Sequence, residues 1–135
     1  MFFGQRLRVL VVEDDGDAFN ATAGMLERLC CSVNGETQSL EALRAFSEEP
    51  DRFDLAILDN VVDGVTGLEL AKRFRRMRPG FPVMLYTGNA GKASPEDIEA
   101  AGIGWVIAKP LTSGELEGLI KDALTWAATS RRSRA

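Results

Sequence analysis

The chain has 135 residues, which fits a single domain. Its 16 basic and 20 acidic side chains give a formal charge of −4, whereas nucleic-acid-binding domains are usually basic. No apolar run approaches the roughly 20 residues that cross a bilayer, and the first six residues do not resemble a signal peptide. The chain contains no histidine, which excludes catalysis by histidine and metal ligation by histidine. The neighbouring Cys30 and Cys31 are expected to be buried or half-buried thiols at a helix end, in a reducing cytoplasm.

Five short segments are predicted as strands: residues 7–12, 32–37, 53–58, 82–86 and 105–108. Four of them are largely apolar on both faces, which is typical of parallel strands covered by helices on both sides. Residues 32–37 are more polar, so this segment is expected at an edge of the sheet.

Amphipathic stretches alternate with these strands and predict helices. Their apolar positions fall on one helical face in each stretch: Phe19, Ala23, Leu26 and Cys30; Leu40, Leu43 and Phe46; Leu70, Phe74 and Met77; Leu116, Leu119, Ile120, Ala123, Leu124 and Ala127. Two helix starts are marked by Ser94-Pro95 and by the capping box Thr112-Ser113-Gly114-Glu115, and Pro79-Gly80 is expected to end a helix.

The alternation of five strands and five helices predicts an α/β fold with right-handed crossovers. We expect a flavodoxin-like, doubly wound (βα)5 arrangement, with a five-stranded parallel sheet of order 2-1-3-4-5 and helices on both faces. The predicted division of the chain is an extension over residues 1–6, a domain over 7–128 and a basic tail over 129–135, with Ser130 to Ala135 frayed.

Polar residues directly follow four of the predicted strands: Glu13-Asp14, Asp59, Thr87-Gly88 and Lys109-Pro110. Ligands of doubly wound sheets bind at the carboxyl ends of the strands, so these residues are expected along one rim. Three carboxylates in one crevice repel each other unless a cation compensates them, and Mg²⁺ prefers oxygen ligands.

The other two residues of this rim complete a site for phosphoryl transfer. Lys109 would supply a positive charge and Thr87 a hydroxyl donor, and both can stabilise a transferring phosphoryl group. Asp59 can itself be the acceptor, forming an acyl phosphate. Each residue alone has a more ordinary explanation, such as a helix cap or a turn. The joint pattern favours the site.

Four motifs resemble those of the receiver domains of two-component signalling, over residues 7–126. They are Val11-Val12-Glu13-Asp14, Leu58-Asp59 with Gly67 eight positions on, Tyr86-Thr87-Gly88, and Ala108-Lys109-Pro110-Leu111. The resemblance implies that Asp59 is phosphorylated. It also implies that Mg²⁺ is bound by Asp59, directly by Asp14, through water by Glu13, and by the backbone carbonyl of Val61.

The same resemblance implies how the phosphoryl oxygens are held. Lys109, Thr87 and the backbone amides of Val61 and Gly88 would contact them. Asp15 is expected to belong to the N-terminus of the first helix instead.

Three positions depart from the family pattern. Asp63 stands where proline is frequent, and it is expected to start the turn into the third helix. Val61 stands where many members carry a polar side chain. Val106 replaces the usual switch aromatic, and Trp105 lies one step earlier, on the opposite face of the strand. We therefore expect Trp105 to be a packing or edge-surface residue.

The resemblance implies a phosphorylation-dependent signalling switch of a phosphorelay, which changes its docking surface. Its partners would be a sensor histidine kinase or phosphotransfer domain and a downstream effector, with no nucleic acid or membrane bound, as a monomer or phosphorylation-linked dimer in the cytoplasm. It would catalyse its own phosphorylation and slow dephosphorylation, yet act as a signalling protein and not a metabolic enzyme.

Three alternatives belong to other functional classes. One is an interaction module of the same fold that works without phosphorylation. Another is an aspartate-nucleophile phosphohydrolase, but Val61 occupies the position of its second aspartate. A third is a flavodoxin-like cofactor binder, but the acidic loop from Glu13 to Asp17 would repel a flavin phosphate.

Overall fold

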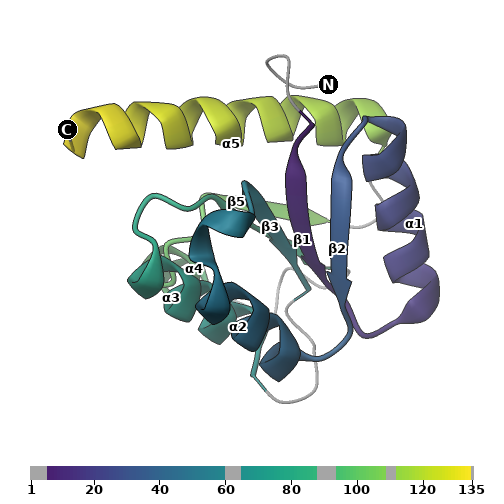
Figure 1. The fold of residues 1–135 in the computed structure, drawn as a ribbon, viewed down its shortest axis with the longest axis horizontal. Helices are drawn as coiled ribbons and strands as arrows, with labels where there is room; N and C mark the ends of the chain where they lie inside the picture. Colours follow the sequence, from purple (N-terminus) through teal and green to yellow (C-terminus); the bar gives the residue numbers. More distant parts are fainter. Residues whose placement is uncertain (1–5, 60–64, 88–93, 109–111, 135) are drawn as a thin grey trace.

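The computed structural model describes residues 6–59, 65–87, 94–108 and 112–134. Strands and helices alternate along the chain, as Figure 1 shows. The elements are β1 (Arg8–Val12), α1 (Gly16–Arg28), β2 (Ser32–Glu36), α2 (Ser39–Glu48), the 3-10 turn η1 (Pro50–Arg52), β3 (Leu55–Leu58), α3 (Gly67–Met77), β4 (Val83–Thr87), α4 (Pro95–Ala100), β5 (Trp105–Ala108) and α5 (Ser113–Arg134). Within these residues no helix is long and apolar enough to cross a membrane.

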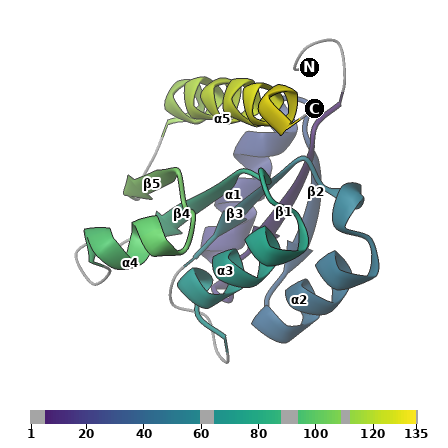
Figure 2. The ribbon, with the colours of Figure 1, turned by 90° about the vertical axis from the view of Figure 1, so that its left-hand side faces the viewer.

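The five strands form one parallel sheet of order β2-β1-β3-β4-β5, which confirms the predicted fold and the edge position of β2. Helices α1 and α5 cover one face, and α2, α3 and α4 cover the other (Figure 2). In the register, Val12 lies opposite Glu36 on one side and Leu58 on the other. The central strands therefore end level with one another, and the residues that follow them emerge at one rim.

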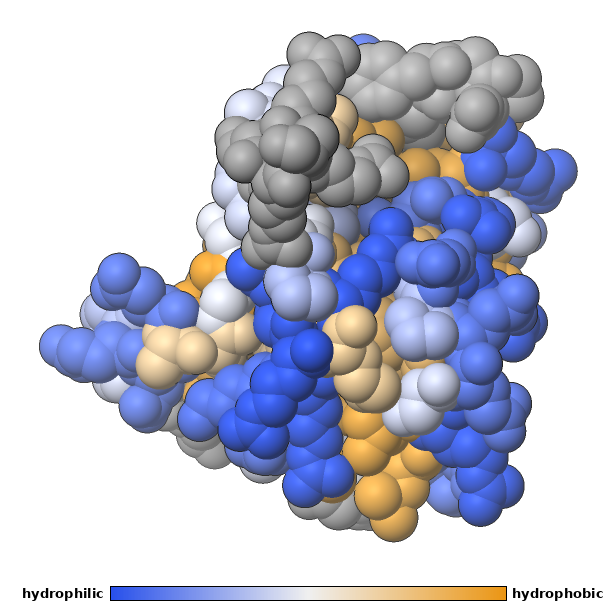
Figure 3. Space-filling model, turned by 60° about the vertical axis from the view of Figure 1, so that its left-hand side comes forward, coloured by the Kyte–Doolittle hydropathy of each residue, from blue (hydrophilic) through white to orange (hydrophobic). Residues whose placement is uncertain are grey.

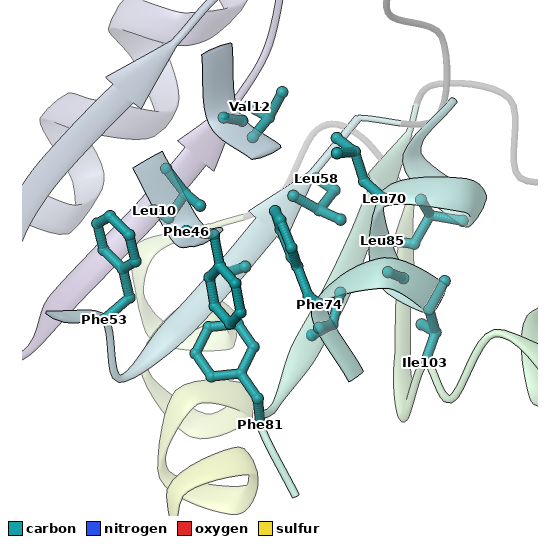
Figure 4. Close-up of a cluster of buried hydrophobic side chains, with 14 of the residues drawn as sticks. Leu10, Val12, Phe46, Phe53, Leu58, Leu70, Phe74, Phe81, Leu85 and Ile103 are labelled. Carbon is teal, nitrogen blue, oxygen red and sulfur yellow. The ribbon is translucent and has the colours of Figure 1, made fainter. Parts of the chain in front are cut away.

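An aromatic cluster fills the core between the sheet and helices α2 and α3 (Figure 4). The rings of Phe46 and Phe74 stack with centroids 4.3 Å apart, and Phe81 lies 4.9 Å from Phe46. All three side chains are fully buried. On the opposite face, Leu26 of α1 and Ile120 of α5 pack against β1 and β3. Burial of this apolar surface on both faces is the main stabilising contribution to the fold.

The predicted helix boundaries agree with the hydrogen bonds at the helix ends. The Ser94 side chain accepts from the Asp97 N–H at 3.1 Å, with Pro95 as the first residue of α4. The Thr112 hydroxyl accepts from the Glu115 N–H at 3.1 Å, and the Glu115 carboxylate accepts from the Thr112 N–H at 3.3 Å. Both starting signals are confirmed, and α3 ends just before Pro79-Gly80 as predicted.

Three residues assigned to apolar helix faces are exposed, so those assignments were wrong. Leu40 is 61% and Met77 is 38% exposed, because each lies at a helix end beyond the core. Cys30 lies in the turn after α1, where it adopts a φ of 64° and is exposed to solvent. The Cys31 N–H donates to the Leu26 carbonyl and closes this turn. Cys31 is buried as expected, and this burial raises the pKa of its thiol to about 11.

The frayed conformation expected from Ser130 onward was also wrong, because α5 continues to Arg134. Residues 119–134 contain neither glycine nor proline, so no residue of this segment interrupts the helix. The C-terminal end of α5 projects beyond the edge of the sheet (Figure 1). The division into residues 1–6, 7–128 and 129–135 remains a prediction.

Candidate functional site

Backbone hydrogen bonds beyond the ends of two strands bring the acidic residues together. The Glu13 N–H donates to the Glu36 carbonyl at 3.1 Å, which extends the pairing of β1 and β2 by one residue. The Asp59 N–H donates to the Val12 carbonyl at 3.0 Å, which does the same for β3 and β1. The sheet itself thus places Asp59 beside the acidic pair.

The carboxylates of Glu13, Asp14 and Asp59 each offer an oxygen, and these three oxygens lie within 4.8 Å of one another. Glu13 is buried, Asp59 is half-buried and Asp14 is exposed. The group therefore has an inner wall and an open outer side. Three oxygen donors with an open side fit a hard divalent cation that keeps part of its water shell, as Mg²⁺ does.

Asp15 supports this group from the first helix, as the sequence indicated. Its carboxylate caps α1 by accepting from the N–H groups of Asp17 at 2.9 Å and Ala18 at 3.2 Å. Its own N–H lies 3.4 Å from the carboxylate of Glu13. Asp15 is therefore a helix cap, and the Glu13 carboxylate is held next to the helix start.

The floor below the carboxylates includes two buried residues that the sequence did not single out as site residues. A small pocket beneath Glu13 and Asp59 is lined by Thr22 of α1 and Tyr86 of β4. Thr22 is 3% and Tyr86 is 9% exposed. The signal for Thr22 was a polar residue on the apolar face of α1, one position before Ala23.

Ser39 was also missed, although it contacts Val65, which lies six residues after Asp59. Its side chain is fully buried at the start of α2, and its hydroxyl donates to the Val65 carbonyl. Thr66 then caps α3 by accepting from the Glu69 N–H at 3.2 Å. The chain is thus held by hydrogen bonds at Val65 and Thr66, immediately before α3. The predicted turn residue Asp63 lies outside the described residues.

Other predicted site residues are placed only in part. The backbone of Thr87 pairs with Ala108 at the ends of β4 and β5, so it reaches the same rim. Val61, Gly88 and Lys109 lie outside the described residues.

The structure does describe the part of β5 where receiver domains usually carry the switch aromatic. Val106 is 40% exposed, whereas Trp105 is half-buried. The Trp105 ring packs edge-to-face on Trp126 of α5 with centroids 5.8 Å apart. The packing role predicted for Trp105 is therefore confirmed.

The family model of the response regulator receiver domain matches residues 9–121. Over 117 residues the chain is 31% identical to the response regulator receiver protein CpdR of Brucella abortus, covering 87% of this chain and 96% of CpdR. It is 28% identical over 121 residues to the transcription factor SKN7 of Chaetomium thermophilum. That match covers 90% of this chain but 16% of SKN7, so the chain spans only a small part of this relative.

Two solved structures show the same fold at comparable identity. A CheY-like receiver domain protein from Methanospirillum hungatei JF-1 has a TM-score of 0.81 and 29% identity, covering 93% of this chain and 99% of that one. TrrA from Thermotoga maritima, a response regulator in complex with Mg²⁺-BeF, has a TM-score of 0.79 and 25% identity. The match covers 87% of this chain and 99% of TrrA.

Proposed function

The chain belongs to the response regulator receiver domain family of two-component signalling, and from this we propose that it is a switch operated by phosphorylation of Asp59. One observation carries the proposal. Asp59 directly follows a central strand, and its carboxylate lies within 4.8 Å of those of Glu13 and Asp14. The acidic cluster thus stands at the usual phosphoacceptor site of the family.

In this proposal Asp59 is the nucleophile. A carboxylate oxygen of Asp59 attacks phosphorus, the bond to the donor breaks, and an acyl phosphate forms. Asp59 is half-buried, so one side of its carboxylate is accessible to a donor while the backbone bond to Val12 holds its position. The donor would be a sensor histidine kinase or a phosphotransfer domain in the cytoplasm.

We propose Mg²⁺ as the cofactor, held directly by Asp14 and Asp59, through water by Glu13, and by the Val61 carbonyl. The three neighbouring carboxylates suit this ion, and the related TrrA structure contains Mg²⁺ together with BeF. When bound, Mg²⁺ would neutralise charge on the transferring phosphoryl group. Glu13 and Asp14 would orient the ion. Glu13 is buried and Asp14 is exposed, so Asp14 lies nearer to solvent.

The remaining proposed contacts come from residues at the ends of β4 and β5. Lys109, Thr87 and the amides of Val61 and Gly88 would hold the phosphoryl oxygens. A signal would follow because Thr87 and the segment after it move toward the phosphoryl group. The exposed aliphatic Val106 has no large ring to rotate, so we expect no aromatic rotation at this position.

The experiment is incubation with acetyl phosphate and Mg²⁺, followed by intact mass measurement. Wild type should gain one phosphoryl group, and Asp59→Asn should gain none while remaining folded. Asp14→Ala should lose labelling at low Mg²⁺ and recover part of it at high Mg²⁺. Unchanged labelling of Asp59→Asn would refute the acceptor assignment. No labelling of wild type would favour the alternative, an interaction module independent of phosphorylation.

A further inference from the structure

A groove between α3 and α4 carries concentrated positive charge outside the acidic site. It has a volume of about 510 Å³ and is lined by Lys72, Arg75 and Arg76 of α3, by Pro79 just after α3, by Ala100 of α4, and by Ala101 and Gly102 just after α4. None of these residues belongs to the acidic cluster. Figure 3 looks onto this side of the molecule, where strongly hydrophilic surface covers α3 beside the projecting α4.

Arg75 has a structural role in this groove. Its guanidinium donates to the Gly102 carbonyl at 2.8 Å and lies 5.2 Å from the centre of the Trp126 ring. These contacts join α3 to the turn after α4 and to α5. They also hold one positive charge in a fixed position at the groove wall, so little side-chain entropy would be lost when an anion binds there.

Lys72 and Arg76 lie one helical turn apart on α3, where like charges repel. Within the residues that the structure describes, no carboxylate pairs with either side chain, whereas Arg73 of the same helix pairs with Glu69 at 3.4 Å. The C-terminal dipole of α3 tolerates cations here but does not neutralise them. Three cations thus converge in a chain whose net charge is −4.

We propose that this groove binds an acidic peptide segment of a partner protein. Carboxylates of the segment would face Lys72 and Arg76, and its small or apolar side chains would face the apolar lining residues Pro79, Ala100 and Ala101. The groove is open, and its charged side chains are half-buried to exposed, which suits an elongated ligand better than a small enclosed anion.

The neighbouring helix argues against nucleic acid as the ligand. Glu96, Asp97 and Glu99 of α4 are all exposed beside the groove. A long polyanion that crossed this face would meet their carboxylates, whereas a short peptide can bind within the groove without extending along α4. The proposal concerns the chain without phosphorylation of Asp59, and the two sites share no residue.

The test uses a short fluorescent peptide of alternating Glu and Ala, with an alternating Gln and Ala peptide as control. Fluorescence anisotropy with the full chain should show binding of the acidic peptide that weakens as salt rises. Lys72→Gln/Arg76→Gln should weaken it about tenfold, through loss of two charge contacts. The matched double variant Arg28→Gln/Arg44→Gln removes the same charge from exposed positions on α1 and α2 and should bind like wild type.

Four results of the peptide assay would overturn the proposal. They are absence of binding, equal binding of the two peptides, equal weakening by the two double variants, and displacement of the peptide by tripolyphosphate at equal charge concentration. Sedimentation of the same samples separates self-association from peptide binding. A dimer that only Lys72→Gln/Arg76→Gln dissociates would mean that α4 of a second copy is the occupant, and would also overturn it.

Discussion

At the scale of single residues, the position two after Asp59 bears on how long the phosphoryl group persists. Hydrolysis needs a water in line with the bond from Asp59 to phosphorus. By resemblance to the family, we expect Val61 and Asn89 to flank that line, and both lie outside the described residues. Valine offers no hydrogen bond to a water, and the amide of Asn89 is neutral and a poor base.

We therefore predict slow dephosphorylation of wild type and faster loss from Val61→Asn. The lifetime should shorten severalfold to tenfold, equivalent to about 1 kcal/mol of barrier. The measurement is a time course of phosphate loss after removal of the donor. An equal or longer lifetime in Val61→Asn would leave Val61 with a backbone role alone.

Gly35 of the edge strand is a second residue with a defined physical role. A Cβ built there would lie 2.1 Å from Cζ of Phe19, so the α1 ring packs directly over the strand backbone. Gly35→Ala should lower the free energy of unfolding by about 1–3 kcal/mol through overpacking. Gly118→Ala in α5 meets no atom within 4 Å and should raise stability by up to about 1 kcal/mol. Urea unfolding would measure both, and a neutral Gly35→Ala would show that Phe19 moves aside freely.

At the scale of elements, a hydrogen bond joins the start of α2 to Val65, just before α3. Ser39 begins α2 without capping it, and its hydroxyl instead binds the Val65 carbonyl. Ser39→Ala should cost about 1 kcal/mol of stability and should slow phosphorylation of Asp59 by acetyl phosphate, because the chain between Asp59 and α3 loses this hydrogen bond. Ser47→Ala is the matched control, since the Ser47 hydroxyl donates to the Leu43 carbonyl within α2 and lies 3.4 Å from the Met77 sulfur, so its contacts do not involve Val65. Equal phosphorylation rates in the two variants would limit Ser39 to a role in stability.

The start of β1 is joined to the start of β3 by Arg8 and Asp54. The Arg8 backbone N–H and guanidinium donate to the Asp54 carboxylate at 2.9, 3.2 and 3.1 Å. Partial burial alone would raise the pKa of Asp54, but the hydrogen bonds from Arg8 and the positive charges of Arg8 and Arg78 together outweigh it and leave that pKa below its usual value.

A carboxyl whose pKa is lower in the folded state stabilises the fold above its unfolded pKa, about 3.9 for aspartate. This stabilisation is lost as pH falls through the folded pKa. Wild type should therefore exceed Asp54→Asn in unfolding free energy by a constant amount near neutral pH, and the difference should shrink below about pH 4. Denaturant unfolding across this range is the measurement, and a difference independent of pH would contradict the assignment.

At the scale of the whole molecule, periodicity was enough to predict the sheet and the rim. Strands β1, β3 and β4 are apolar on both faces because helices cover both, and that burial appears directly in the sequence. The meeting of Asp59 with Glu13 then follows from strand order alone. Contacts such as Ser39 with Val65 join residues 26 positions apart without a periodic signal, so they required the structure. The same holds for the α3–α4 groove, whose cations share a helix but whose other lining residues lie outside that helix.

The central claim is that the rim of the sheet converts Asp59 into an acyl phosphate. Borohydride reduction tests it most directly, because it converts an aspartyl phosphate into homoserine at the residue that carried the phosphoryl group. After treatment with acetyl phosphate and Mg²⁺, peptide mapping should find homoserine at position 59, and chelation of the metal should abolish it. Homoserine at Asp14 or another carboxylate, or at no position while phosphate remains bound, would contradict the account.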